Sequence, residues 1–249
     1  MMRTANPTLN DNTFAIPGRS IVAGESMTIQ GTVNRTGVLL LLVLLTAAWI
    51  WDQYYTSPDQ RAITVWLLGG AIGGFIVALV TVFKKQWAAV TAPLYALLEG
   101  LVLGGISAML EGRYPGIVIQ AVGLTFGTLV GLLLAYKSGL IRATENFKLG
   151  VVAATGGIAI IYLVTMVLGL FGVHMPYIHE SGLIGIGFSL FVVVVAALNL
   201  VLDFDFIENG ARQGAPKYME WYGAFGLMVT LIWLYIEILR LLSKMRERK

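Results

Sequence analysis

The sequence predicts an all-α integral membrane protein, a bundle of seven transmembrane helices. Of its 249 residues, 57% are hydrophobic and only 12% are charged, and the mean hydropathy is +0.78. A soluble fold of this length would lack the polar surface needed to cover its core. Seven apolar runs follow one another, each close to the roughly 20 residues that a helix needs to cross a bilayer. The lipid bilayer is therefore the expected partner of most of the chain.

The expected spans follow in order from a polar N-terminal segment, residues 1–32, which has no apolar core of a signal peptide, so the first helix is expected to be retained. Short connections predict antiparallel neighbours in one bundle, without a separate soluble domain. Gly210 is expected to cap the sixth helix and Pro216 to open the seventh. A basic C-terminal tail, residues 243–249, remains. The seven spans are expected at residues 33–51, 62–83, 88–110, 115–136, 149–171, 183–209 and 216–242.

Three glycines in the fourth span, Gly123, Gly127 and Gly131, are spaced four residues apart. This spacing places them on one face of a helix, where a partner backbone can approach closely. The strip predicts tight helix packing.

Lys and Arg in the short loops predict the orientation. The loops after the first, third and fifth helices hold only Arg61 and Arg113, so the other loops and the N-terminus are expected in the cytoplasm, with the chain in the cytoplasmic (inner) cell membrane. Seven crossings then place the basic tail outside, against the same rule. Either the charges around the earlier helices determine the orientation and the basic tail lies outside, or one segment does not cross. The segment lengths favour seven crossings. The loops after the even helices hold Lys84, Lys85, Lys137, Arg142, Lys148, Arg212 and Lys217, and the tail holds Lys244, Arg246, Arg248 and Lys249.

The composition argues against several classes of function. The chain has no Cys, which excludes disulfides and thiolate metal sites. No hydrolase elbow, zinc-protease motif or phosphate-binding loop is present, so we expect neither an enzyme nor a cofactor. The net charge of +3 is small, and the basic residues lie in loops, so no nucleic-acid partner is expected. His174 and His179 are spaced poorly for a metal site and are interpreted as surface residues.

Four acids lie inside the spans: Glu99, Asp203, Glu220 and Glu237. Each costs on the order of 3 kcal/mol to insert, and therefore needs a partner, water or a purpose. From the expected helix ends, Asp203 lies about 9 Å and Glu220 about 6 Å inside the membrane, so their depths match. Glu237 lies about 30 Å along the seventh helix, where a local ion pair with Arg240 is the simplest interpretation.

Two acids at one depth, Asp203 and Glu220, suggest a proton-sensitive contact between the sixth and seventh helices. Close carboxyl groups in a low dielectric cannot both ionise easily, so we expect them to share a proton near neutral pH. Loss of that proton would make them repel and would create ligands for a transient Ca²⁺ ion; no other metal site is expected. The alternative is that these two acids, with Asp205 and Glu208, only face water at helix ends.

Three stretches carry a family resemblance: TAPLYALLEGLVLGGIS at 91–107, VLDFDFIENG at 201–210 and YMEWYGAF at 218–225. Together they resemble the Bax inhibitor-1 (TMBIM) superfamily, and with the polar NPTLND at 6–11 they resemble its bacterial Bax inhibitor-1-like branch. The resemblance implies a seven-helix fold with the last helix central. It also implies a pH-sensitive calcium leak controlled by two aspartates, on the sixth and seventh helices.

The resemblance assigns the first of those aspartates to Asp203 and the second to Glu220, so these are the expected proton-sensing and gating residues. Glu220 is one methylene longer than aspartate, and the gap between the two acids is shorter than usual in the superfamily. An alternative register would place Trp233 at the second position, with Glu237 one turn away. In that register the usual pair of acids is absent, and calcium conduction loses its usual control.

Secondary acids are assigned to a cation pathway: Glu99, Asp205 and Glu237. Glu99 matches an acidic residue of the superfamily on an early helix, where it either lines the path or bonds neighbouring helices. Two functions therefore remain. The first is a Ca²⁺-permeable, pH-sensitive leak channel. The second is a non-conducting regulatory partner of a membrane protease or stress-response complex, with residues 1–32 as the docking segment.

Overall fold

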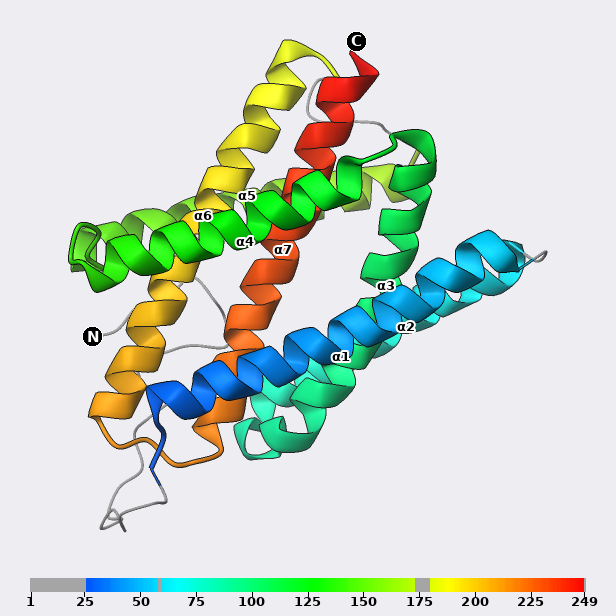
Figure 1. Cartoon of the computed structure of the whole chain (residues 1–249). Helices are drawn as coiled ribbons and strands as arrows, with labels where there is room; N and C mark the ends of the chain where they lie inside the picture. The colour runs from blue at the N-terminus through cyan, green and yellow to red at the C-terminus, as the bar shows by residue number, and fades with distance from the viewer. Residues whose placement is uncertain (1–25, 58–59, 173–179, 249) are drawn as a thin grey trace. The chain divides into compact units, whose positions relative to one another are not determined.

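A computed structural model of the chain describes residues 26–57, 60–172 and 180–248. Within these residues, seven α-helices and one short 3₁₀ helix follow one another, and all seven α-helices are long and apolar enough to cross a membrane. The predicted all-α, multi-pass membrane architecture is confirmed (Figure 1). The elements are α1 (Ile29–Thr56), α2 (Gln60–Phe83), η2 (Lys85–Trp87), α3 (Ala88–Arg113), α4 (Ile117–Lys137), α5 (Glu145–Leu170), α6 (Leu183–Arg212) and α7 (Met219–Glu247).

Several helix ends differ from the expected ones. α1 begins at Ile29 because the Thr28 side chain caps it, accepting a hydrogen bond from the Gly31 N–H at 2.9 Å. α6 continues through Gly210 to Arg212, so the cap predicted at Gly210 is wrong. The left-handed turn that glycine favours lies at Gly214, with φ of 65°.

α7 begins and ends later than expected. Pro216 precedes the helix and forms an isolated antiparallel bridge with Ser26, so the prediction that it opens α7 is wrong. At the other end, α7 runs to Glu247, and most of the expected basic tail is helical.

Glycines allow the close packing of α1 and α2 against α3. A Cβ at Gly100 would overlap Thr46 and the Val43 carbonyl of α1, and one at Gly105 would overlap Leu67 of α2. Small residues on α3 therefore let two neighbouring backbones approach.

The glycine strip of α4 has no packing partner among the described residues. A Cβ at Gly123, Gly127 or Gly131 would find no atom within 4 Å in the part of the chain that the structure describes, and all three residues are exposed. The prediction of tight packing there is wrong, since the buried face of α4 carries Ala121 and Thr125 instead. Four-residue spacing identified one face of the helix but not the face that is covered.

The helices form two compact units. Unit 1 contains the described residues of Gly116–Asp205 and Thr230–Lys249; unit 2 contains those of Asn12–Pro115 and Phe206–Val229. α6 and α7 therefore each contribute to both units. α7 is the most buried of the seven spans, with 61% of its membrane window buried, as expected for the last helix.

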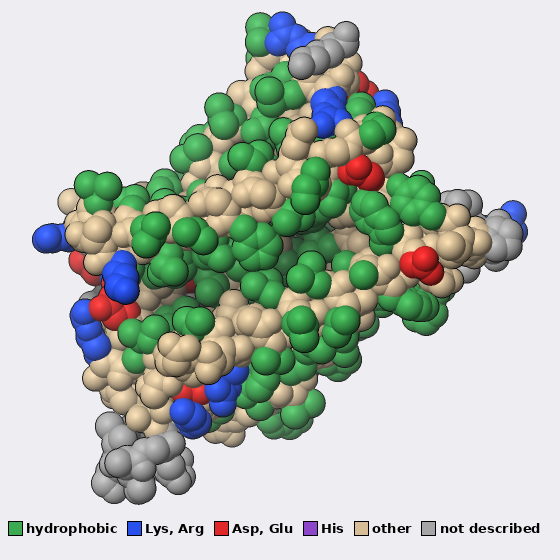
Figure 2. Space-filling view, in the orientation of Figure 1, with side chains coloured by type: hydrophobic (Ala, Val, Ile, Leu, Met, Phe, Trp, Pro, Cys, Tyr) green, Lys and Arg blue, Asp and Glu red, His purple; other side chains and the backbone are tan. Residues whose placement is uncertain are grey.

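The outer faces of the helices are apolar. Large side chains such as Leu41, Phe75 and Leu163 are exposed, and Figure 2 shows hydrophobic side chains over much of the visible face, with most charged side chains near helix ends. Such surfaces require lipid as their solvent, so the bilayer is the environment of this fold.

Candidate functional site

Glu220 is the most completely enclosed acid of unit 2. It lies in the first turn of α7 and its side chain is 0% exposed. Its Oε1 atom accepts a hydrogen bond from the Thr28 backbone N–H at 3.0 Å and another from the Thr28 hydroxyl at 2.8 Å. The carboxylate therefore faces the N-terminus of α1, where the helix dipole favours negative charge.

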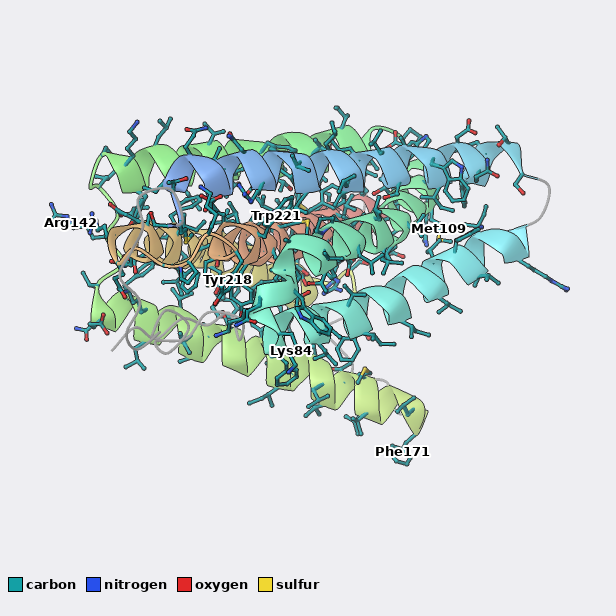
Figure 3. All side chains as sticks on the ribbon, turned by 90° about the horizontal axis from the view of Figure 1, so that it is seen from below. Lys84, Met109, Arg142, Phe171, Tyr218 and Trp221 are labelled. Atoms are coloured by element: carbon teal, nitrogen blue, oxygen red, sulfur yellow. The ribbon has the colours of Figure 1, made fainter. Side chains whose placement is uncertain are left out.

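Two cations complete the surroundings of Glu220. Arg35 of α1 places Nη1 2.5 Å from Oε2, and Lys217 places Nζ 2.8 Å from Oε1. The Arg35 guanidinium also lies over the ring of Trp221, 5.1 Å from its centroid. One buried negative charge thus faces two positive charges, which makes the ionised carboxylate tolerable inside the protein. Figure 3 marks Trp221 and Tyr218 near the start of α7.

The local backbone makes room for this carboxylate. A Cβ at Gly31 would overlap the Glu220 carboxyl group, so a larger residue at this position would force the carboxyl group to move. Just before the helix, the Met27 N–H donates to the Ala215 carbonyl at 2.6 Å, and Met27 is 2% exposed. The start of α1 is therefore attached to the connection between α6 and α7.

Asp203 of unit 1 is almost completely buried, as is Glu237 of the same unit. Asp203 lies on α6, and 1% of it is exposed. The alternative in which Asp203 and Glu220 face water is wrong, because both side chains are buried. Asp203 belongs to unit 1 and Glu220 to unit 2, so their pairing stays a prediction.

The distances of the two acids from their helix ends differ from the expected values, because α6 ends later and α7 begins later than expected. Asp203 lies nine residues, or about 13.5 Å, before the end of α6 at Arg212. Glu220 is the second residue of α7, about 1.5 Å from its start. The expected match of 9 Å and 6 Å came from placing the two ends at Asn209 and Pro216.

Asp205 and Glu208, the other two acids near the end of α6, have cationic partners. Asp205 pairs with Lys148 of α5 at 2.9 Å, and Lys148, which also lies 3.5 Å from Glu145, is almost buried. Glu208 pairs with Arg212 one turn on. Lys148 therefore has a structural partner, although the sequence suggested only a loop cation.

Glu99 lies near the middle of α3 and is partly buried. Its carboxyl group is hydrogen-bonded to the Tyr95 side chain one turn earlier. It also approaches α2, since a Cβ at Gly74 would lie 3.3 Å from its Oε1. Both expected roles, lining a path and joining helices, stay open.

Glu237 forms the local ion pair that the sequence predicts. Its Oε1 lies 2.9 Å from Arg240 Nη1, and the Tyr162 hydroxyl of α5 donates to the same oxygen at 3.0 Å. Arg240 Nη1 also donates to the Tyr162 oxygen at 2.7 Å. This closed triangle in unit 1 accounts for a buried carboxylate without any permeant ion.

Two cations of the expected tail, Lys244 and Arg246, also bind within unit 1. Lys244 is 5% exposed and donates to the Gly185 carbonyl at 3.1 Å and to Ser189 Oγ at 2.9 Å. Arg246 donates to Gln120 at 3.1 Å. These two cations are part of the helix packing at the end of α7.

Sequence reasoning missed Thr28, Arg35 and Tyr162. Arg35 lies inside the first expected span, and a cation in an apolar run needs a partner, so this signal was available. Thr28 follows a pattern of helix starts, Ser or Thr shortly before an apolar run. Tyr162 had no such signal, because a tyrosine in an apolar run is common.

Metal-binding clusters are absent from the described residues: no three His, Cys, Asp or Glu side chains gather there. His174 and His179 lie outside the described residues.

Comparison with known proteins gives one assignment. The sequence profile of the family described as Bax inhibitor 1 like matches residues 6–247, nearly the whole chain. No curated protein matches the sequence.

Proposed function

The chain belongs to the Bax inhibitor 1 like family, and from this premise we propose that it is a pH-sensitive calcium leak channel controlled by Asp203 and Glu220. The observation that carries the proposal is the burial of two acids on membrane-spanning helices, 1% exposed at Asp203 and 0% at Glu220. Buried acids in such helices typically mark ion or proton pathways.

The two acids have different surroundings, which gives them different tasks in the proposed mechanism. Arg35 and Lys217 form ion pairs with Glu220 and balance its charge. Glu220 therefore stays ionised and holds the start of α7 against α1. Asp203 acts as the acid that gains and loses a proton. Because an ionised carboxylate is poorly tolerated in a buried membrane position, its ionisation favours a conformation that admits water or a cation.

Calcium is the proposed permeant ion because carboxylate oxygens are the ligands that it prefers. A deprotonated Asp203 would offer two such oxygens on α6. Protonation removes the charge and the ligand together, so flux should fall as the pH falls. The channel needs no cofactor, and we propose transport without catalysis.

The proposed orientation has the N-terminus in the cytoplasm, in the cytoplasmic membrane of a cell. Support comes from the excess of Lys and Arg in the loops after α2, α4 and α6. The opposing charges at the end of α7 carry less weight because Lys244 and Arg246 are engaged in hydrogen bonds within unit 1.

Calcium flux into proteoliposomes containing the purified full-length chain tests the proposal. A calcium-sensitive dye inside the vesicles should report flux that exceeds that of empty vesicles and rises with pH. We expect the change in flux to lie within about pH 5 to 8, where protonation switches commonly operate. Absence of flux throughout this range would refute the leak. Sodium and potassium gradients in the same vesicles measure selectivity.

The alternative, a regulatory partner that docks through the N-terminal segment, needs a carefully placed truncation. Removing residues 1–30 would also remove Thr28 and disturb Glu220, because Thr28 donates two hydrogen bonds to that carboxylate. Deleting residues 1–25 leaves these contacts in place. A leak should survive this deletion, whereas a docking function should be lost along with co-purification of the partner.

A further inference from the structure

We infer that residues Ser26, Met27 and Thr28 form a latch, a short strap that holds the start of α7 and the α6–α7 connection against α1. Ser26 pairs with Pro216 as an antiparallel bridge, and the Met27 N–H donates to the Ala215 carbonyl. Figure 1 shows the beginning of α1, in blue, beside this orange connection. The strap is therefore joined to the α6–α7 connection by a short stretch of backbone pairing.

The strap is also packed by a side chain. Met27 is 2% exposed, and a Cβ at Gly223 of α7 would lie 3.3 Å from its Cε atom. The absence of a side chain at Gly223 leaves room for Met27. An apolar side chain thus fixes the strap against the second turn of α7.

Thr28 joins the strap to the charged site. Its hydroxyl accepts from the Gly31 N–H to cap α1 and donates to Glu220, while its backbone N–H donates to the same carboxylate. Arg35 and Lys217 supply the charges that face Glu220 in this unit. Detaching the strap would remove two of the hydrogen bonds to Glu220 and leave mainly the two ion pairs.

The arrangement connects the N-terminal segment to the acid on α7. Ser26 directly follows the first 25 residues of the chain, and the strap joins them to the contacts that Thr28 makes with Glu220. Release of the latch would free the α6–α7 connection. Its effect on flux rests on the proposed leak function; the latch itself does not.

Thiol labelling tests the latch without any flux measurement. The chain has no Cys, so Met27→Cys creates a single thiol that is protected while the strap is attached. Adding Thr28→Val removes the hydroxyl that caps α1 and bonds Glu220, and labelling by a water-soluble maleimide should become about 5- to 10-fold faster. Thr28→Ser should keep the slow rate.

Thr36→Val is the matched control. Thr36 lies two turns further along α1, is buried, and donates its hydroxyl to the Thr32 carbonyl of the same helix. Met27→Cys with Thr36→Val should label as slowly as Met27→Cys alone. Equal labelling rates in the Thr28→Val and Thr36→Val backgrounds would overturn the latch, provided that both proteins elute as single species with unchanged helicity.

A cross-link tests whether the latch controls flux. Residues opposite each other in an antiparallel bridge have Cα atoms about 4.5 to 5.5 Å apart, within the range of a disulfide. Ser26→Cys with Pro216→Cys should therefore oxidise to a locked form whose calcium flux is reduced and recovers with a reductant. Ser26→Cys alone should not respond to the reductant.

The possible results separate the two proposals. If the wild-type chain leaks and the locked form leaks equally before and after reduction, the latch does not control flux and that part is overturned. If the wild-type chain never leaks, the leak function fails, while the labelling rates still decide whether the strap is held through Thr28.

Discussion

Thr28 donates two hydrogen bonds to one oxygen of Glu220, from its backbone N–H at 3.0 Å and from its hydroxyl at 2.8 Å. The two residues are 192 positions apart in the sequence. Because Thr28 also caps α1, the same side chain defines where α1 starts and holds the first turn of α7. Movement of either helix end at this site must break contacts of the other.

Neutralising Glu220 should strongly destabilise the protein. Glu220→Gln leaves Arg35 and Lys217 facing an uncharged amide, and breaking a buried ion pair from one side costs about 3–5 kcal/mol. The free energy of unfolding in mixed detergent micelles measures the loss. Adding Arg35→Gln should recover part of it, with a coupling of about 1–3 kcal/mol in the double-mutant cycle. Strictly additive losses would show that the two side chains do not interact.

A methyl group at Gly31 should destabilise the protein. Gly31→Ala places a Cβ on the Glu220 carboxylate, so we expect a loss of about 1–3 kcal/mol in the free energy of unfolding. Gly37, on the same helix, has open space around it, and Gly37→Ala should be neutral or stabilise by up to about 1 kcal/mol. A larger loss at Gly37 than at Gly31 would contradict the described packing.

The Tyr162 hydroxyl should contribute to stability but not to gating. Tyr162→Phe removes a donor to Glu237 and an acceptor for Arg240, which should cost about 1–2 kcal/mol. Calcium flux per folded molecule should keep its pH profile, since the Glu237 triangle belongs to the packing of unit 1. Tyr54→Phe serves as the control because the described contact of Tyr54 is made by its ring, with Tyr55. A shifted pH profile in Tyr162→Phe alone would assign this triangle to the pathway.

Single cysteines in the cysteine-free chain should report the orientation. Leu140, in the turn after α4, and Phe171, at the end of α5, are 82% and 78% exposed. Figure 3 marks Phe171 at the end of its helix. With the N-terminus in the cytoplasm, an impermeant maleimide added to whole cells should label Phe171→Cys and leave Leu140→Cys unlabelled until the cells are opened. The reverse pattern would invert the proposed topology.

Local patterns predicted the architecture because a membrane span is a local property. Length and apolar content identified all seven helices, and three-residue spacing identified the pair of Glu237 and Arg240. The surroundings of Glu220 could not be predicted in this way. Thr28 and Arg35 reach it from α1, and no spacing rule connects residues so far apart in the sequence.

Helix ends limited the prediction of the site. Gly210 and Pro216 have the residue types of a cap and a helix start, but the turn lies at Gly214 and α7 starts at Met219. Shifts of three residues are small for a helix of this length, yet they amount to about 4.5 Å along its axis, so distances counted from the expected ends do not hold for the observed ends. The prediction that the glycine strip of Gly123, Gly127 and Gly131 packs tightly was wrong for a related reason, since periodicity does not say which face of a helix is covered.

The pH profile of calcium flux in Asp203→Asn proteoliposomes tests the proposed gate most directly. Asparagine resembles the protonated acid in shape but cannot ionise, so flux should stay at the level of empty vesicles at every pH, while the wild-type flux rises with pH. Asp205→Asn, two residues further on α6, provides the neighbouring control and should keep the wild-type profile. An Asp203→Asn variant that is folded and leaks with the wild-type pH dependence would contradict the account.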